Sequence, residues 1–321
     1  MRTRICDMLG ISVPIIQAGM SIHTAPELVA AVSNAGGLGS LGCWRRSADD
    51  IRAHVAHIRA TTNRSFALNH VVPALDAEAF AESLALCPTA ITFALGDGGD
   101  LIDQAHDAGA IVIQQVTTVD QARRAADDGA DIIIAQGGEG GGYGGSVSSL
   151  VLWPQVIDAV GQIPVVAAGG ISDGRGLAVA LMLGAEGINV GTRFLASIES
   201  SINANYKAAI VEAQSQDAIK VELLNDLRPM PGAFGYGTVL RSLRTSFTDD
   251  WQPRREQAAR HIDQLREELD ASSRAGRAHE LFAAAGQSSG AIKDILSVDE
   301  IIRSFIVEAH AALKRAGSFR Q

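Results

Sequence analysis

The stretch from residue 163 to residue 196 constrains the fold most, because it contains two buried strands that each end in a glycine turn. The apolar run 164–168 leads into Gly169 and Gly170, and the run 187–190 leads into Gly191 and Thr192. A helical segment that Asp173 can cap joins the two runs, so parallel strands deliver both turns to one edge of a sheet. Backbone N–H groups at such turns, helped by a helix N-terminus, bind an anion of phosphate size. Tight connections alone would explain one such turn, whereas two turns one βαβ unit apart favour a phosphate site.

Short apolar segments recur along the first 198 residues, and each but the last is followed by a helical pattern. This alternation predicts a parallel sheet with helices outside it. The economical fold is a (β/α)8 barrel over residues 1–198, with an eighth helix supplied from later in the chain. A doubly wound sheet is the alternative, and the absence of a G-x-G-x-x-G motif after the first strand counts against it. The expected strands are 13–17, 37–41, 65–69, 90–95, 110–115, 131–135, 164–168 and 187–190.

The pattern changes after residue 198, where charged helical segments replace the alternating strands and helices. Helices are expected over 205–213 and 252–273, and the glycine-containing stretch 230–245 between them is expected to be a loop. We therefore predict a mostly helical lid domain, residues 199–280, inserted over the barrel mouth. As the least regular part of the chain, the lid is expected to define the substrate.

The end of the chain, residues 281–321, is predicted to return to the barrel. A last helical run spans residues 291–315 and is interrupted near Ser297.

Composition narrows the class of protein. The chain has 321 residues, 47% hydrophobic and 20% charged, which is typical of a soluble globular protein with a large core. A formal charge of −9 argues against nucleic acid or an anionic membrane as the main partner. The three cysteines form no metal-binding pattern, and no apolar run approaches the ~20 residues of a membrane helix. We therefore expect a cytoplasmic protein without a metal, and apolar residues near Trp251 could serve a homodimer contact.

Several segments, taken in order, resemble the nitronate monooxygenases, which were formerly called 2-nitropropane dioxygenases and are FMN-dependent TIM-barrel enzymes. FMN-dependent enoyl-acyl-carrier-protein reductases and NADH:quinone reductases are close relatives of that family. The resemblance covers residues 5–198 and roughly the last 35 residues, and it is loose over 199–280. The segments that carry it are AGM at 18–20, AVSNAGGLG at 31–39, FALN at 66–69, ITFALG at 91–96, QGGEGGGYGG at 136–145, AAGGISDGRG at 167–176, NVGTRFLA at 189–196 and QSSG at 287–290.

The resemblance implies FMN as the cofactor and a set of residues that hold it. Asn69 and Met20 also have plainer interpretations, as a residue that caps a turn and as core filling. Ser288, which would close the far side of the site with Gln287, is a candidate catalytic residue. The implied FMN contacts are Ala18, Gly19, Met20, Asn69, Gln115, Gln136, Gly141, Gly169, Gly170, Gly191, Thr192 and Gln287.

Tyr143 marks a departure from the family, because relatives usually have a histidine at this position of the loop after strand six. The phenol of tyrosine has an ordinary pKa of ~10, against ~6.5 for histidine, so Tyr143 is a poor base at neutral pH. It can still donate a hydrogen bond to a nitronate oxygen or to a developing oxyanion. A nitronate is already deprotonated, so we expect Tyr143 to suit nitronates better than neutral nitroalkanes. A tyrosine that merely packs in a glycine-rich loop is the plainer alternative.

Other polar side chains at the expected strand ends give weaker indications. Gln115 stands close to where the quinone reductases carry a lysine, and it keeps hydrogen bonding without positive charge near the flavin. His70 directly follows Asn69 and could reach the flavin, and His23 could face the barrel mouth. For both histidines a role outside catalysis is favoured.

Three functions remain open at this point. The first is oxidation of alkyl nitronates by O2. The second is an NAD(P)H-dependent FMN reductase acting on an enoyl thioester or a quinone, with Lys207, Arg241 and Arg244 as anion contacts from the lid. The third is a barrel that binds FMN or another phosphate ligand without catalysis. A lyase or isomerase is disfavoured, because no Lys–Asp or Lys–Glu pair stands at the strand ends.

Overall fold

The computed structural model describes residues 1–229 and 238–319. Within these residues eight parallel strands form the barrel, in the order β1-β9-β8-β6-β5-β4-β3-β2, and a bridge between Ile16 and Leu38 closes the ring. The predicted (β/α)8 barrel is therefore confirmed. Its strands are β1 (Ile15–Gln17), β2 (Gly39–Gly42), β3 (Phe66–Val71), β4 (Ala90–Ala94), β5 (Ile111–Val116), β6 (Ile132–Gln136), β8 (Val165–Ala168) and β9 (Gly187–Val190).

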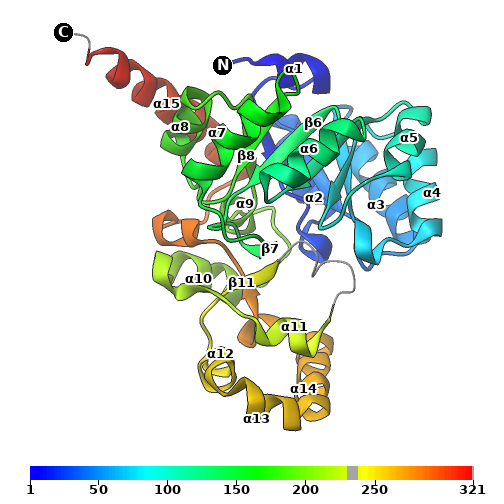
Figure 1. Cartoon of the computed structure of the whole chain (residues 1–321), viewed down its shortest axis with the longest axis vertical. Helices are drawn as coiled ribbons and strands as arrows, with labels where there is room; N and C mark the ends of the chain where they lie inside the picture. Colours follow the sequence, from blue (N-terminus) through cyan, green and yellow to red (C-terminus); the bar gives the residue numbers. More distant parts are fainter. Residues whose placement is uncertain (230–237, 320–321) are drawn as a thin grey trace.

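Amphipathic helices surround the barrel, and a short helix, α1 (Arg4–Leu9), lies at its amino end (Figure 1). Ser47, Asp76 and Thr118 each cap a helix by accepting a hydrogen bond from its first turn, which explains where these helices begin. The surrounding helices are α2 (Pro26–Asn34), α3 (Ala48–Thr61), α4 (Ala77–Ala85), α5 (Asp100–Asp107), α6 (Val119–Asp127), α7 (Ser149–Val160) and α8 (Gly174–Met182), and a short α9 (Thr192–Leu195) follows the last strand.

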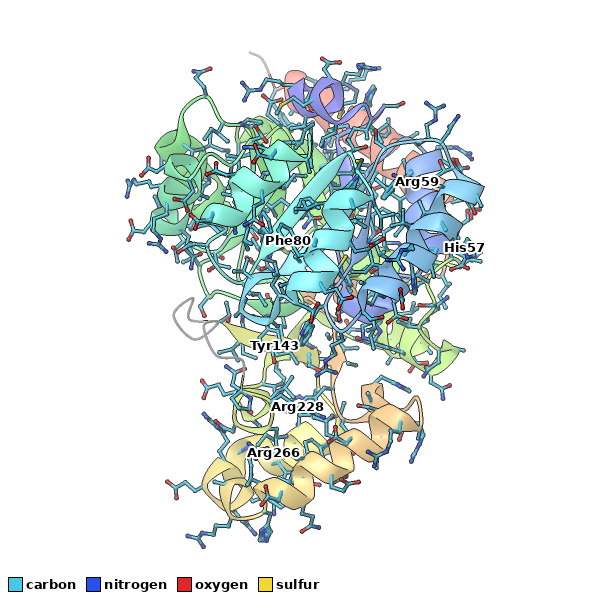
Figure 2. The ribbon with its side chains drawn as sticks, turned by 90° about the vertical axis from the view of Figure 1, so that its right-hand side faces the viewer. His57, Arg59, Phe80, Tyr143, Arg228 and Arg266 are labelled. Atoms are coloured by element: carbon cyan, nitrogen blue, oxygen red, sulfur yellow. The ribbon has the colours of Figure 1, made fainter. Side chains whose placement is uncertain are left out.

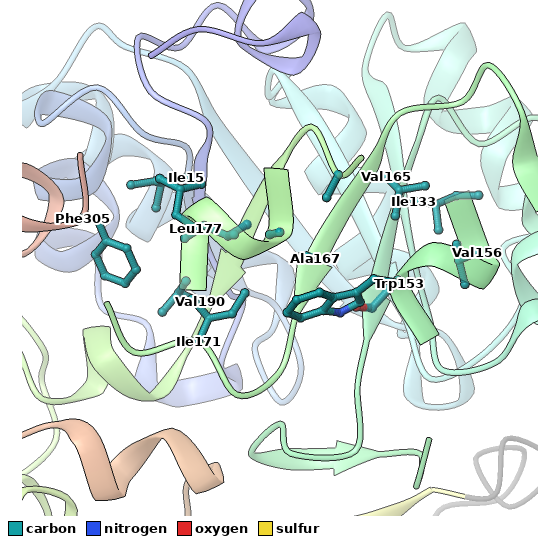
Figure 3. Packing of buried hydrophobic residues seen from close by; sticks show 14 of the residues in the cluster. Ile15, Ile133, Trp153, Val156, Val165, Ala167, Ile171, Leu177, Val190 and Phe305 are labelled. Atoms are coloured by element: carbon teal, nitrogen blue, oxygen red, sulfur yellow. The ribbon is translucent and has the colours of Figure 1, made fainter. Parts of the chain in front are cut away.

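The eighth helix of the ring is α15 (Val298–Gly317), which Ser297 caps and which packs between α8 and α2 (Figure 1). Gly174 allows a close approach, because a Cβ there would lie 2.2 Å from the backbone oxygen of Phe305. The Phe305 ring is fully enclosed in the layer between sheet and helices (Figure 3). In the same layer the indole of Trp153 donates to the backbone oxygens of Ala135 (3.1 Å) and Ala168 (3.2 Å).

The lid consists of helices and a small antiparallel sheet below the barrel mouth in Figure 1. The central strand of this sheet is β11 (Val239–Leu243), which pairs with β7 (Gly142–Gly144) of the loop after β6. That loop is therefore part of the lid sheet. The remaining lid elements are α10 (Ala204–Glu212), β10 (Ala218–Lys220), α11 (Leu223–Leu227), α12 (Ser246–Trp251), α13 (Arg255–Arg260), α14 (Ile262–Arg274) and β12 (Ala283–Ala284).

Two expectations about local structure in the lid are wrong. The stretch 230–245 is not all loop, because Val239–Leu243 form β11; residues 230–237 of that stretch lie outside the described residues. The expected helix 252–273 is broken into a 3₁₀ turn, α13 and α14, because His261 leaves the helical conformation and its N–H bonds to Ala258. The break lets Leu265 of α14 pack into the lid core.

Trp251 itself packs within the lid, and the homodimer contact expected near it stays a prediction. Its ring is partly buried against the lid core, 6.0 Å from the ring of His261 and 5.4 Å from the guanidinium carbon of Arg254. Among the described residues, the large apolar side chains that are exposed lie elsewhere, for example Leu150 and Met182. Among residues 1–229 and 238–319, no helix is both long and apolar enough to cross a membrane.

Candidate active site

A group of neutral amide side chains lies at the carboxyl ends of the barrel strands. Asn69 on β3, Gln115 on β5 and Gln136 on β6 occupy positions that alternate with the outward-facing core residues of their strands, so they point into the barrel. Gln115 donates to the Oε1 of Gln136 at 2.7 Å, and Asn69 donates to the backbone oxygen of Thr92 at 3.4 Å. The structure thus brings these three predicted residues to one mouth of the barrel. Their contact with FMN stays a prediction.

Asn189 on β9 belongs to the same group and was missed by the sequence analysis. It pairs in register with Ala168 and Ile16, both of which line the barrel interior. Its Oδ1 is buried and has no hydrogen-bond partner among the described residues. Leaving a buried amide oxygen unpaired costs about 1–3 kcal/mol, so this atom is suited to accept a hydrogen bond from a ligand. The sequence does contain an indication that Asn189 belongs to the site: strict alternation in the segment 187–190 places an asparagine where an apolar residue is usual.

The turn Ala18-Gly19-Met20 follows β1 and passes directly over Asn69. A Cβ on Gly19 would lie 2.4 Å from the Cβ of Asn69, so only glycine fits there. Met20 is partly buried, and a Cβ on Gly191 would lie 3.4 Å from its sulfur. The turn after β1 therefore lies beside the turn after β9.

The two glycine turns that follow β8 and β9 form the expected cradle. Gly169 and Gly170 have φ values of +94° and +74°, in the region that favours glycine. Among the described residues, the N–H groups of Gly170 and Gly191 donate to no protein acceptor outside regular secondary structure. The hydroxyl of Thr192 instead accepts from the N–H of Gly286 at 3.0 Å, which ties the C-terminal segment to the cradle.

Glu139, in the loop after β6, anchors that loop to its surroundings. Its carboxylate accepts hydrogen bonds from the N–H (3.0 Å) and hydroxyl (2.8 Å) of Ser149 at the start of α7. Burial opposes ionisation, but the hydrogen bonds from Ser149 and Ser148 outweigh it and lower the pKa of Glu139. Its backbone oxygen accepts from the N–H of Gln287 at 2.9 Å, which brings Gln287 to the loop.

The predicted residues Gly141 and Ser288 lie at this junction. A Cβ on Gly141 would lie 2.6 Å from the backbone of Ala285, so glycine is required where the C-terminal segment crosses the loop. Ser288, which stands two residues after Gly286, is buried.

Tyr143 lies on β7 between the barrel and the lid, with Arg228 on the lid side (Figure 2). Its ring packs against the small cluster formed by Ala94 and Leu95. Burial raises the pKa of the Tyr143 phenol, and the positive charges of Arg45 and Arg228 oppose this shift only in part. The phenol therefore stays protonated at neutral pH, so it can serve as a hydrogen-bond donor and not as a base.

Two cations of the lid bind the carbonyl oxygens of the loop that carries Tyr143. Arg241 donates to the oxygen of Gly138 at 2.8 and 3.1 Å, and Lys220 donates to that of Gly144 at 2.6 Å. Burial and the charge of Arg241 lower the pKa of Lys220 to about 8. The sequence analysis missed Lys220, whose environment depends on pairing between distant segments.

Arg244 and Lys207, two of the expected anion contacts, bind other parts of the protein. Arg244 pairs with Asp249 at 2.6 Å, and Lys207 donates to the backbone oxygen of Ile198 at 3.2 Å, so the expectation of lid anion contacts from these two is not supported.

The two histidines considered in the sequence analysis also have protein neighbours. The ring of His70 contacts the Ser83 hydroxyl at 3.0 Å and the edge of Phe80 on α4, outside the barrel, because adjacent strand residues point to opposite faces. Burial lowers the pKa of His70 to about 4. His23 packs against the ring of Tyr206.

Comparisons with known proteins identify the family. The family model described as nitronate monooxygenase matches residues 2–87 and 82–308. The (3aS,4S,5R,7aS)-5-hydroxy-7a-methyl-1-oxo-octahydro-1H-indene-4-carboxyl-CoA dehydrogenase of Mycobacterium tuberculosis is 33% identical over 350 aligned residues, covering 99% of each chain. A probable nitronate monooxygenase of Staphylococcus saprophyticus is 33% identical, over 69% of this chain and 76% of its own length. The solved structure of FabK from Thermotoga maritima has a TM-score of 0.88 and 34% identity over the whole of both chains. The chain is therefore an oxidoreductase that belongs to the nitronate monooxygenase family.

Proposed function

We propose that the protein is an FMN-dependent dehydrogenase of a coenzyme A thioester. One observation carries this choice: the match to the coenzyme A thioester dehydrogenase of Mycobacterium tuberculosis extends over 99% of each chain. It therefore includes the lid, the part expected to define the substrate. A dehydrogenase of the same description from Rhodococcus jostii is 38% identical over 68% of this chain.

The residues at the barrel mouth fit FMN. The N–H groups of Gly170 and Gly191 are free to bind its phosphate, and the unpaired Oδ1 of Asn189 can accept from a hydroxyl of its ribityl chain. Gln115 and Gln136 offer neutral hydrogen bonds to the ring edge. FMN held there would supply a two-electron oxidant for removing two hydrogens from adjacent carbons of the thioester.

Tyr143 acts on the substrate as a hydrogen-bond donor in this proposal. Its hydroxyl makes no hydrogen bond within the described part of the chain, so the donor is available to the thioester carbonyl. If a base removed the proton beside that carbonyl, negative charge would grow on its oxygen, and a donor in a buried site would stabilise the charge. The positive charge of Arg228 acts in the same direction.

Oxidation of alkyl nitronates by O2 is the second candidate. The family model and the staphylococcal relatives support it, and the Tyr143 hydroxyl can also donate to a nitronate oxygen. A nitronate needs no base, which fits a tyrosine in place of the family histidine. NAD(P)H as reductant belongs to the reductase alternative.

The test is an anaerobic spectrum of the FMN-loaded protein, mixed in separate samples with a panel of linear and alicyclic acyl-CoA thioesters, propionate-3-nitronate, NADH or NADPH. We expect the visible flavin bands to bleach with one of the thioesters. Bleaching with nitronate alone would establish the second candidate, and bleaching with a nicotinamide alone would favour a reductase. If FMN does not bind at all, the flavoenzyme assignment is wrong.

A further inference from the structure

A cavity of about 520 Å³ lies beside the barrel mouth, between the segments that follow β2 and β3. Its lining is mixed: Val71, Leu75 and Ala79 are among its apolar residues, and Trp44 and Arg45 also line it. None of the residues predicted to contact FMN lines this cavity. It is therefore a space next to the candidate FMN site and separate from it.

The cavity adjoins Tyr143. Trp44 and Val71 line it, and both also pack with Tyr143 around the cluster of Ala94 and Leu95. The charge of Arg45 acts on the Tyr143 phenol. A substrate whose reacting end lies at Tyr143 thus has this cavity available for its remaining part.

Arg45 has an aromatic neighbour but no acidic partner within the described part of the chain. Its side chain is exposed, it has no hydrogen bond or ion pair within residues 1–229 and 238–319, and its guanidinium carbon lies 4.8 Å from the centre of the Trp44 ring. The neighbouring Arg46 is different, because it donates to the backbone oxygens of Gly42 and Thr24. Arg45 alone of this pair is free to bind an anion.

The acidic residues around the cavity are mostly engaged elsewhere. Asp76 accepts from the N–H of Ala79 at 2.8 Å, and Asp49 pairs with Arg52. Glu78 is exposed on the rim. The cavity therefore combines apolar side chains, an indole, the guanidinium of Arg45 and these carboxylates.

We propose that this cavity binds the diphosphate-bearing arm of the coenzyme A thioester, with Arg45 contacting the phosphates; the identity of the arm rests on the proposed function. The arm has apolar and amide segments that end in a diphosphate, and the lining offers apolar side chains together with an arginine. Arginine binds phosphate through paired, charge-assisted hydrogen bonds. A nicotinamide dinucleotide carries the same diphosphate, so the test must separate these two sources.

The experiment measures dissociation constants of coenzyme A, pantetheine and NADH for the FMN-loaded full chain by calorimetry. Pantetheine has the same arm without the nucleotide diphosphate. We expect coenzyme A to bind the wild type at least about tenfold more tightly than pantetheine, since one charge-assisted hydrogen bond contributes about 1.5–3 kcal/mol. Arg45→Gln should remove this difference and Arg45→Lys should keep part of it. Arg123→Gln, which changes an exposed arginine on α6, is the control and should keep all of it.

Equal binding of coenzyme A and pantetheine to the wild type would overturn the proposal, as would an undiminished difference in Arg45→Gln. If Arg45→Gln weakens NADH and leaves coenzyme A unchanged, the assignment to the thioester arm is wrong and the diphosphate belongs to a nicotinamide. The measurement needs no turnover, so the two proposals fail separately. Tight, Arg45-dependent binding of coenzyme A together with no flavin bleaching by any thioester would contradict only the dehydrogenase function.

Discussion

Tyr143 and Tyr206 allow an effect on catalysis to be distinguished from an effect on folding, because each can be replaced separately by phenylalanine. The Tyr206 hydroxyl donates to the backbone oxygen of Ala284 at 2.8 Å, whereas the Tyr143 hydroxyl is free of hydrogen bonds among the described residues. Tyr143→Phe should therefore lower kcat by about 10²-fold, the usual effect of removing one oxyanion donor, and leave the melting temperature unchanged. Tyr206→Phe should lower the free energy of unfolding by about 1 kcal/mol with little change in kcat. Equal loss of kcat in both variants would remove Tyr143 from the chemistry.

At the level of elements, the ladder between β7 and β11 lets the lid hold the loop that carries Tyr143, and Lys220 of β10 reinforces it. The pKa of Lys220 is about 8 in the folded protein, below its ordinary value of 10.5. The unfolded chain therefore binds more protons than the folded one between these two values, and stability should rise with pH across this window. We expect the free energy of unfolding of the wild type to rise relative to that of Lys220→Met between pH 8 and pH 10.5, measured by urea denaturation. Parallel pH profiles for the two proteins would contradict this account.

For the whole molecule, the ring of helices is closed by a segment from the far end of the chain. Phe305 of α15 is buried against the barrel, so Phe305→Ala should cost about 3–5 kcal/mol and should also weaken FMN binding by loosening the β8–β9 end of the barrel. Val307→Ala on the same helix changes a side chain that is 62% exposed and should cost less than about 0.5 kcal/mol. Chemical denaturation and FMN fluorescence titration measure the two effects. A small cost for Phe305→Ala would mean that α15 is not needed for closure.

The sequence predicts the parts of this molecule that local patterns determine. Buried strands followed by glycine turns predicted the barrel, and Asn69, Gln115 and Gln136 were placed at one mouth because parallel strands share their carboxyl edge. Pairing between distant segments was not predictable in this way. The lid strand Val239–Leu243 has its partner about a hundred residues earlier in the chain, and the environment of Lys220 follows from that pairing.

The shared ladder of β7 and β11 has a consequence for how this family could diversify. Because Gly142–Gly144 and the lid strand Val239–Leu243 exchange backbone hydrogen bonds, the proposed donor Tyr143 and the segment expected to select the substrate form one structural unit. A chimera that takes the lid of a relative without that relative's β7 segment would pair a β7 and a β11 that come from different proteins. Recombination of specificity among these barrels therefore has to transfer two separate stretches of sequence together.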